Sequence, residues 1–226
     1  AINCWNKQGH GEIEIREAIE QSCNYYFNMV GFKLGQDENG EFSENRSLTV
    51  LQKYASEIGL DKKTGIELTE SSPQVSNAYA VPSYIGQGTN AYTTSQLARY
   101  ATTIATSGTV YDLTLLDRQT DSKGSVLKEY EPNVINTMDV SQNVWDDIHD
   151  GMYRVVQTHK QFDGLGVQVA GKTGTAEVDG VYHPNHGMFI GYAPATDPQY
   201  AIAVRIENGY SSGNACLAAD DIFKYI

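Results

Sequence analysis

Four consecutive residues, Lys172-Thr173-Gly174-Thr175, carry the clearest chemical signal in the chain. They belong to the stretch 167–178, whose apolar alternation and β-branched residues predict a β-strand. A lysine ammonium beside two hydroxyls can hold a carboxylate, because lysine presents its charge as a mobile point donor. The glycine between the hydroxyls lets the backbone of a bound molecule approach closely. This tetrapeptide therefore predicts the capture of a carboxylate beside a reacting carbonyl.

A second polar group, Ser22-Cys23-Asn24, interrupts a helical pattern that extends from Ile13 to Gly35. Taken alone, a serine or an asparagine at a helix end is usually a cap that satisfies a backbone group. The joint occurrence of Ser22 and Asn24 with Lys172 in one chain favours a functional role instead.

Two thiols and an imidazole, those of Cys4, His10 and Cys23, lie in and before the same region. Thiolate and imidazole are ligands that suit Zn²⁺, which is usually four-coordinate at structural sites. Three interpretations stay open: a structural zinc with its fourth ligand elsewhere, a Cys4–Cys23 disulfide, or buried thiols beside a surface histidine. The remaining cysteine, Cys216, is expected to pack at the start of the last helix.

Apolar spacing predicts the elements that must position these residues. Helices are expected at 13–35 on both sides of Ser22, then at 48–58, 93–108, 141–157 and 214–226. Strands are expected at 167–178, 187–192 and 200–207, with short connections that favour antiparallel pairing. Thr93 and Gln96 have the spacing of a capping box. The stretch 111–136 is expected to be an irregular excursion with a turn at 122–124.

Length and composition limit the classes of protein to consider. With 226 residues, 40% apolar and 10% aromatic, the chain is long and apolar enough for one globular domain. We expect a mainly helical part, 1–160, followed by an antiparallel sheet with a terminal helix, 161–226. A net charge of −12 argues against binding to nucleic acid or to an anionic membrane surface. Because the chain begins at Ala1 and lacks an initiator methionine, we expect it to be part of a longer polypeptide.

Further stretches accompany these motifs in a fixed order along nearly the whole chain. They are 9–11 with 16–19, 22–27, 85–88 with 94–98, 170–177, and 188–194. Single triplets occur by chance, but the ordered set is much more specific. The set resembles the transpeptidase domain of class B penicillin-binding proteins, of the elongation or sporulation type. The resemblance implies an α/β (α+β) serine transpeptidase and β-lactamase-like fold: an antiparallel sheet with flanking helices and a helical subdomain, truncated at the N-terminus.

The resemblance also implies a reaction and a role for each matched residue. The reaction is peptidoglycan D,D-transpeptidation, an acyl transfer from a stem peptide ending in D-Ala-D-Ala through an acyl-serine, and it requires no cofactor. Lys172 would hold the terminal carboxylate, with Thr173 and Thr175 adding hydrogen bonds, and the Thr175 amide would be an oxyanion donor. Ser22 would relay a proton, and Asn24 would orient the substrate amide.

The same resemblance extends to partners and location. It implies that the complete protein binds β-lactams, has a glycosyltransferase partner and is anchored in the membrane at its extracytoplasmic face. Some elongation-type members carry a zinc where Cys4, His10 and Cys23 stand in this chain.

One element of the family is not matched in its expected place. A Ser-x-x-Lys tetrad with the nucleophile should precede Ser22, but none of the 21 residues before Ser22 forms it. We therefore expect the nucleophile to belong to another segment and the isolated chain to be inactive. Two alternatives stay open: a β-lactam sensor or β-lactamase-like protein, although no acidic residue matches a deacylating base, and a non-catalytic scaffold module of a cell-wall complex.

Overall fold

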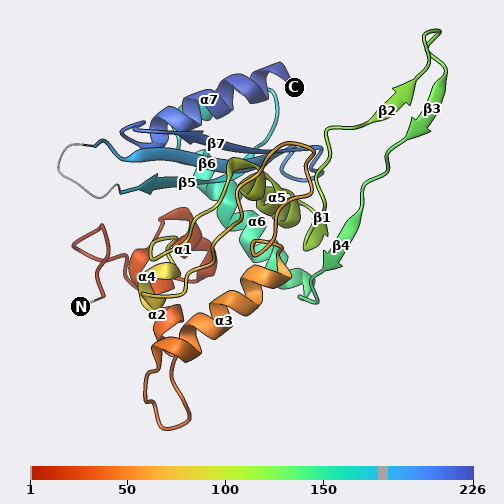
Figure 1. Ribbon diagram of the computed structural model, residues 1–226. Helices are drawn as coiled ribbons and strands as arrows, with labels where there is room; N and C mark the ends of the chain where they lie inside the picture. Colours follow the sequence, from red (N-terminus) through yellow and green to blue (C-terminus); the bar gives the residue numbers. More distant parts are fainter. Residues whose placement is uncertain (1, 178–182) are drawn as a thin grey trace.

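A three-stranded antiparallel sheet in the order β5-β6-β7 is the centre of the computed structural model, which describes residues 2–177 and 183–226 (Figure 1). The strands are β5 (Ala170–Ala176), β6 (His186–Ala193) and β7 (Tyr200–Ile206). All three predicted strands are confirmed, as is their antiparallel pairing. The first is shorter than expected, and Val178, its predicted end, lies outside the described residues.

Helices cover both faces of this sheet (Figure 1). Helix α7 (Ser212–Tyr225) packs on one face, while α5 (Thr94–Ala105) and α6 (Gln142–Gln157) pack on the other. Alternate residues of β6 point to opposite faces, so Phe189 is buried beneath α7 and Tyr192 is buried on the side of α5 and α6. A short 3-10 turn, Lys160–Phe162, follows α6. The expected packing of Cys216 is confirmed, because it lies near the start of α7 and its side chain is fully buried between that helix and the sheet.

The helical part forms where the apolar spacing predicts it. Helices α1 (Ile15–Glu20) and α2 (Asn24–Leu34) flank Ser22, and α3 (Glu44–Glu57) follows. Thr93 caps α5 through the predicted capping box with Gln96. A single turn, α4 (Ala80–Ser83), lies between α3 and α5. None of the helices in the described ranges combines the length and the apolarity needed to cross a bilayer.

The stretch expected to be an irregular excursion is instead a long two-stranded arm (Figure 1). Strand β1 (Thr109–Tyr111) pairs with β4 (Val134–Thr137), and β2 (Arg118–Thr120) pairs with β3 (Val126–Glu129). The expected turn at 122–124 is confirmed, with the Asp121 carboxylate accepting the amides of Lys123 and Ser125. The prediction failed because the strands are only three or four residues long and mostly exposed, so no alternation of burial marks them.

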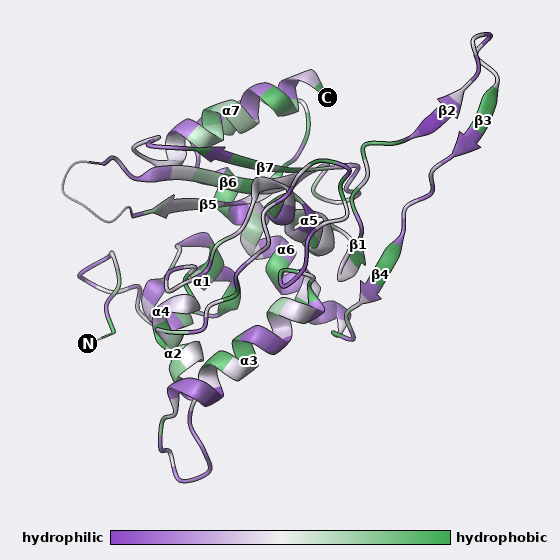
Figure 2. Ribbon diagram, viewed as in Figure 1, coloured by the Kyte–Doolittle hydropathy of each residue, from purple (hydrophilic) through white to green (hydrophobic). Residues whose placement is uncertain are grey.

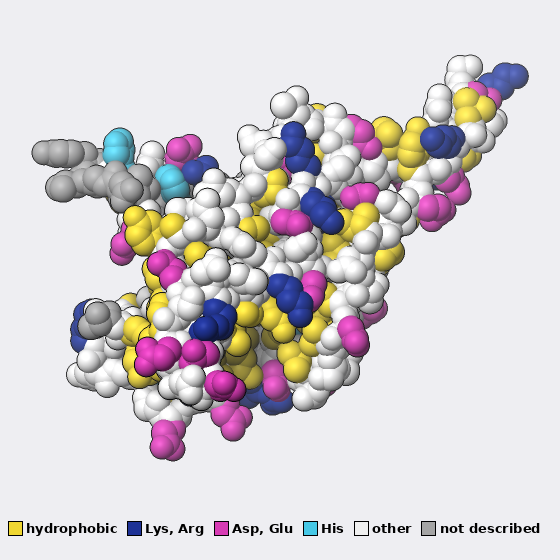
Figure 3. All heavy atoms as spheres, turned by 60° about the horizontal axis from the view of Figure 1, so that its bottom comes forward, with side chains coloured by type: hydrophobic (Ala, Val, Ile, Leu, Met, Phe, Trp, Pro, Cys, Tyr) yellow, Lys and Arg dark blue, Asp and Glu magenta, His cyan; other side chains and the backbone are white. Residues whose placement is uncertain are grey.

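Apolar side chains remain on the surface of this arm. The exposed ones are Leu115, Leu116, Val126, Leu127, Val134 and Ile135. The hydropathy colouring marks hydrophobic positions between β1 and β2 and in β3 and β4, whereas β2 is hydrophilic (Figure 2). In the space-filling view the arm projects from the body with apolar groups beside charged ones (Figure 3).

Candidate active site

Ser22 occupies a left-handed position at the end of α1, with φ of 50°. The amide of Cys23 donates to the carbonyl of Ala18 at 3.0 Å, and the amide of Ser22 donates to that of Ile19 at 3.2 Å. This pair of bonds is the Schellman pattern, in which glycine usually stands at the position that Ser22 holds. A non-glycine residue there costs about 1–3 kcal/mol. The backbone of Ser22 is therefore strained, and its side chain places a hydroxyl at the end of α1.

The side chain of Lys172 reaches this hydroxyl from the sheet. Its Nζ donates to Ser22 Oγ, and also to the carbonyl of Thr173 at 3.1 Å. Lys172 lies opposite Ile190 in the β5–β6 ladder, on the face that α5 and α6 cover. The structure therefore brings together two predicted site residues that are 150 positions apart in the sequence.

Burial changes the acidity of this lysine. Removal from water disfavours the charged ammonium and lowers the pKa of Lys172 to about 8, with a smaller opposing effect from the Cys216 thiol. An amine with this pKa populates both protonation states near neutral pH, which suits a group that exchanges a proton with a neighbouring hydroxyl.

The two threonines of the tetrapeptide lie on the opposite face of β5. Thr173 stands opposite Phe189 and Thr175 opposite Gly187, on the side of the sheet that α7 covers. The hydroxyl of Thr175 accepts the backbone amide of Ser212 at 3.2 Å. The side chains of Thr173 and Thr175 therefore do not point to the same face as Lys172.

Strand β5 is an edge strand among the described residues, since only β6 pairs with it. The free edge of such a strand presents backbone N–H and C=O groups that can pair with an extended peptide. Lys172 and Gly174 share the face that carries Ser22. An extended peptide added along this edge would run beside the Lys172–Ser22 pair.

Asn24, which the sequence predicts to act together with Ser22 and Lys172, begins α2 and is half-buried. Cys23 is the N-cap of that helix, and its Sγ accepts the Tyr26 amide at 3.5 Å. The indole N–H of Trp5 donates to the carbonyl of Ser22 at 3.1 Å and to that of Gln21 at 3.2 Å. The turn that carries Ser22 and Asn24 is thus held between two helices and an indole.

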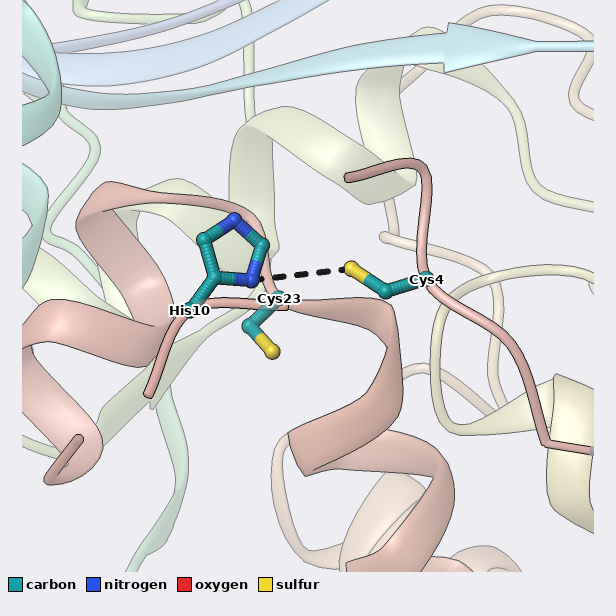
Figure 4. A group of neighbouring side chains, drawn as sticks. All are labelled: Cys4, His10 and Cys23. Atoms are coloured by element: carbon teal, nitrogen blue, oxygen red, sulfur yellow. Dashed lines mark hydrogen bonds between the residues drawn. The ribbon is translucent and has the colours of Figure 1, made fainter. Parts of the chain in front are cut away.

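Cys4, His10 and Cys23 form a cluster behind this turn (Figure 4). Their nearest ligand atoms all lie within 4.8 Å of one another, and Cys4 Sγ is 3.7 Å from His10 Nδ1. With zinc bonds of about 2.0–2.3 Å, ligands in a tetrahedral site are roughly 3.5–3.8 Å apart, so the group fits zinc after a small closure. His10 Nε2 is buried and lacks a hydrogen-bond partner among the described residues.

The acidity of the two thiols differs. Burial raises the pKa of Cys4, but backbone amides, first that of Tyr25, donate to its sulfur and outweigh this effect, so the pKa is lowered overall. Burial and the neighbouring Cys4 raise the pKa of Cys23. One thiol of the pair is therefore disposed to ionise, which metal coordination requires.

A Ser-x-x-Lys sequence occurs after Ser22, at Ser125 to Lys128 in the arm. Residues three apart on a strand point to opposite sides, whereas on a helix they are neighbours. Both residues are exposed, and the Lys128 ammonium lies over the Tyr130 ring at 4.2 Å. The arm extends away from β5 (Figure 1), so this tetrad does not bring a serine to Lys172.

Comparisons with known proteins agree with one another. The family model described as penicillin binding protein transpeptidase domain matches residues 1–226. The peptidoglycan D,D-transpeptidase MrdA of Acinetobacter baumannii is 28% identical over 257 residues, covering 98% of this chain and 35% of that protein. This chain therefore spans about a third of the length of that relative.

Solved structures give the same result. Penicillin-binding protein 2B from Streptococcus pneumoniae strain R6 has a TM-score of 0.81 at 27% identity, covering 94% of this chain and 39% of that one. A ceftriaxone acyl-enzyme complex of penicillin-binding protein A from M. tuberculosis has a TM-score of 0.77 at 26% identity, covering 95% of this chain and 48% of that one.

Proposed function

The chain belongs to the penicillin-binding protein transpeptidase domain family, and on this premise we propose that it forms part of the site of a peptidoglycan D,D-transpeptidase. The observation that carries the proposal is the hydrogen bond between Lys172 and Ser22, which brings the two motifs into direct contact. The similarity to MrdA favours a transpeptidase over a β-lactamase-like protein, a sensor or a scaffold module.

In the proposed reaction, a serine attacks the carbonyl between the two terminal D-Ala residues of a stem peptide. The serine ester forms, the terminal D-Ala leaves with a proton, and an amine of a second stem peptide then attacks the ester to form the cross-link. Ser22 would pass the proton, because its hydroxyl bonds the Lys172 amine, whose pKa near 8 allows both states. While protonated, Lys172 also attracts the substrate carboxylate, a charge-assisted contact of about 1.5–3 kcal/mol.

Strand geometry refines the other roles. We propose that the substrate backbone pairs with the edge of β5 that faces away from β6, and that Asn24, which begins α2, orients the substrate amide from the helical part. Thr175 would contribute its backbone amide to the oxyanion hole, because its hydroxyl already accepts the Ser212 amide. Thr173 would reach the substrate carboxylate only from the strand edge, since its side chain shares the face of α7.

The acyl-accepting serine is proposed to come from a segment outside these 226 residues. Ser22 holds a helix-terminal turn and is bonded to Lys172, and the tetrad at Ser125 lies in the arm. The complete protein would also bind β-lactams, which acylate the same serine. We further propose that it acts at the extracytoplasmic face of the membrane beside a glycosyltransferase, because nascent strands and their stem peptides meet there.

Covalent labelling with a fluorescent penicillin tests this function. A polypeptide that carries this chain together with its Ser-x-x-Lys segment should be labelled, and Lys172→Met should slow labelling on the order of 10²–10³-fold, as loss of one electrostatic contact in an acyl-transfer site does. The 226-residue chain alone should not be labelled. Failure of the complete polypeptide to label contradicts the transpeptidase proposal, and labelling of the isolated chain contradicts the placement of the nucleophile.

We also propose a structural zinc held by Cys4, His10 and Cys23, with a fourth ligand that does not belong to this group. The distances within the group and the lowered pKa of Cys4 support it. The metal would tie the N-terminal loop to the first turn of α2, directly after Ser22. The acyl transfer itself needs no cofactor.

A further inference from the structure

Helices α1 and α6 pack against one another at a residue without a side chain. A Cβ atom added to Gly151 would lie 2.9 Å from Ile19 Cβ and 3.2 Å from the carbonyl oxygen of Arg16. Ordinary contacts between carbon atoms are about 3.5–4.0 Å, so no larger residue fits unless the helices separate by about 0.6–1 Å. Gly151 lies within α6, where glycine weakens a helix relative to alanine by about 1 kcal/mol.

Ion pairs flank this contact along both helices. The guanidinium of Arg16 in α1 lies 2.6 Å from Asp147 and 3.6 Å from Asp150 of α6. Arg154 of α6 in turn lies 3.0 Å from Glu17 and 3.9 Å from Glu20 of α1. Within α6, Arg154 also lies 2.8 Å from Asp150. These side chains are about one-third exposed, so each pair contributes little stability alone. Together, these ion pairs fix the rotation and the register of the six-residue helix α1 relative to α6.

Helix α6 contacts both halves of the proposed site. On one side it packs on α1, whose end carries Ser22 only three residues beyond Ile19. On the other side its residues Met152 and Val155 pack with Ala170 of β5, two residues before Lys172. Ser22 and Lys172 are therefore connected through the packing of α1 on α6 and of α6 on β5. A change in the distance between α1 and α6 changes the distance between Ser22 and Lys172.

We propose that Gly151 is a positioning residue: by letting α1 lie directly on α6, it holds Ser22 within hydrogen-bond reach of Lys172. The inference rests on the proposed function of that pair. A displacement of α1 by about 1 Å would take this bond beyond its range of about 3.2 Å. In catalytic sites, misplacement of this size costs about 10²-fold in rate.

Gly151→Ala tests the proposal, with Gly166→Ala as the matched control. Gly166 is exposed, and a Cβ added there meets nothing within 4 Å. The readout is the pKa of Lys172, measured by NMR in protein labelled with ¹³C at lysine Cε, with the signal assigned through Lys172→Arg. Separation of α1 from the sheet admits water, so the pKa in Gly151→Ala should rise from about 8 toward the ordinary lysine value. Gly166→Ala should leave it unchanged.

A second variant covers the case in which Gly151→Ala does not fold. Arg16→Gln removes ion pairs from a side chain that is 42% exposed, and it should move the same pKa upward by a smaller amount. A folded Gly151→Ala with an unchanged Lys172 pKa overturns the proposal. If that variant is unfolded, an unchanged pKa in Arg16→Gln overturns it. Neither measurement involves acylation, so penicillin labelling can fail or succeed independently of this result.

Discussion

Lys172 on strand β5 and Ser22 at the end of the short helix α1 share a hydrogen bond that joins the sheet to the helical part. The bond joins a half-buried amine to a hydroxyl whose backbone is in the left-handed region. Both features cost free energy of folding: the first through desolvation and the second through strain. Substitutions that remove the buried charge of Lys172 or the strain at Ser22 should therefore stabilise the fold, although these two residues are central to the proposed chemistry.

The cost of burying Lys172 should depend on pH. Its pKa is about 8 in the folded chain and about 10.4 when unfolded, so between these values the unfolded state binds more protons and stability rises with pH. Below pH 8 the full cost is present, on the order of 3 kcal/mol. Lys172→Met should therefore be more stable than the original chain at pH 7, and the difference should shrink by pH 10.5. Urea unfolding at pH 7, 9 and 10.5 measures this, and a constant difference contradicts the shifted pKa.

Ser22→Gly should raise stability and remove the hydroxyl at once. Glycine accepts the left-handed conformation freely, which should add about 1 kcal/mol to the free energy of unfolding and about 2–4 °C to the melting temperature. Ser107 is a matched control, because it has φ of 51° and makes the same Schellman pair of bonds at the end of α5. Ser107→Gly should stabilise equally without affecting penicillin labelling of the complete protein. A lower melting temperature for Ser22→Gly would show that the hydroxyl contributes more than the strain removes.

The zinc proposal predicts a stoichiometry that depends on particular residues. Protein purified without chelator should contain about one zinc per chain, as four-coordinate structural sites do. Cys4→Ser and His10→Ala should lower this content and the melting temperature together, because the metal binds only the folded chain. Cys216→Ala removes a buried thiol outside the group and should keep the metal. A zinc-free protein in which Cys4 is readily alkylated, or one with a Cys4–Cys23 disulfide, contradicts the proposal.

The bond between Thr175 and Ser212 predicts a difference between two conservative changes. Thr175→Val removes the acceptor of the Ser212 amide and should lower the free energy of unfolding by about 0.5–1.5 kcal/mol. Thr175→Ser retains the hydroxyl and should restore most of this loss. Chemical denaturation of the three proteins compares them directly. Equal stability of the valine and serine variants would show that this bond contributes nothing measurable.

Local pattern was enough to predict the main elements of the fold. Periodicity located the helices and strands because each buries one face, as Phe189 and Tyr192 do on opposite sides of β6. The arm escaped prediction because its strands have only three or four residues, and β2, β3 and β4 bury neither face. The sequence showed that the helical pattern of 13–35 is interrupted at Ser22. It did not indicate the left-handed turn there, because a serine stands where a Schellman turn usually has glycine.

Prediction of the site required information about residues that are far apart in the sequence. Nothing local to Lys172 indicates Ser22, which is 150 residues away, and the family resemblance supplied that pairing. Ligand type left several interpretations of Cys4, His10 and Cys23 open, and the structure shows that the three side chains lie together. The role proposed for Gly151 had no sequence signal, because a glycine inside a helix is uninformative until its neighbours are known.

The arm has a consequence for how the chain exchanges amide hydrogens with solvent. Its two ladders are separate two-stranded sheets. The β1–β4 ladder is supported, because β1 packs on α5 and buries Val110, whereas both strands of the β2–β3 ladder are exposed. A two-stranded ladder without such support is marginally stable in water. Deuterium uptake should therefore begin in residues 118–129, long before it reaches β6. A mass-spectrometric time course would show the β2–β3 ladder as an early, isolated step, and slow exchange there would reveal a covering surface in solution.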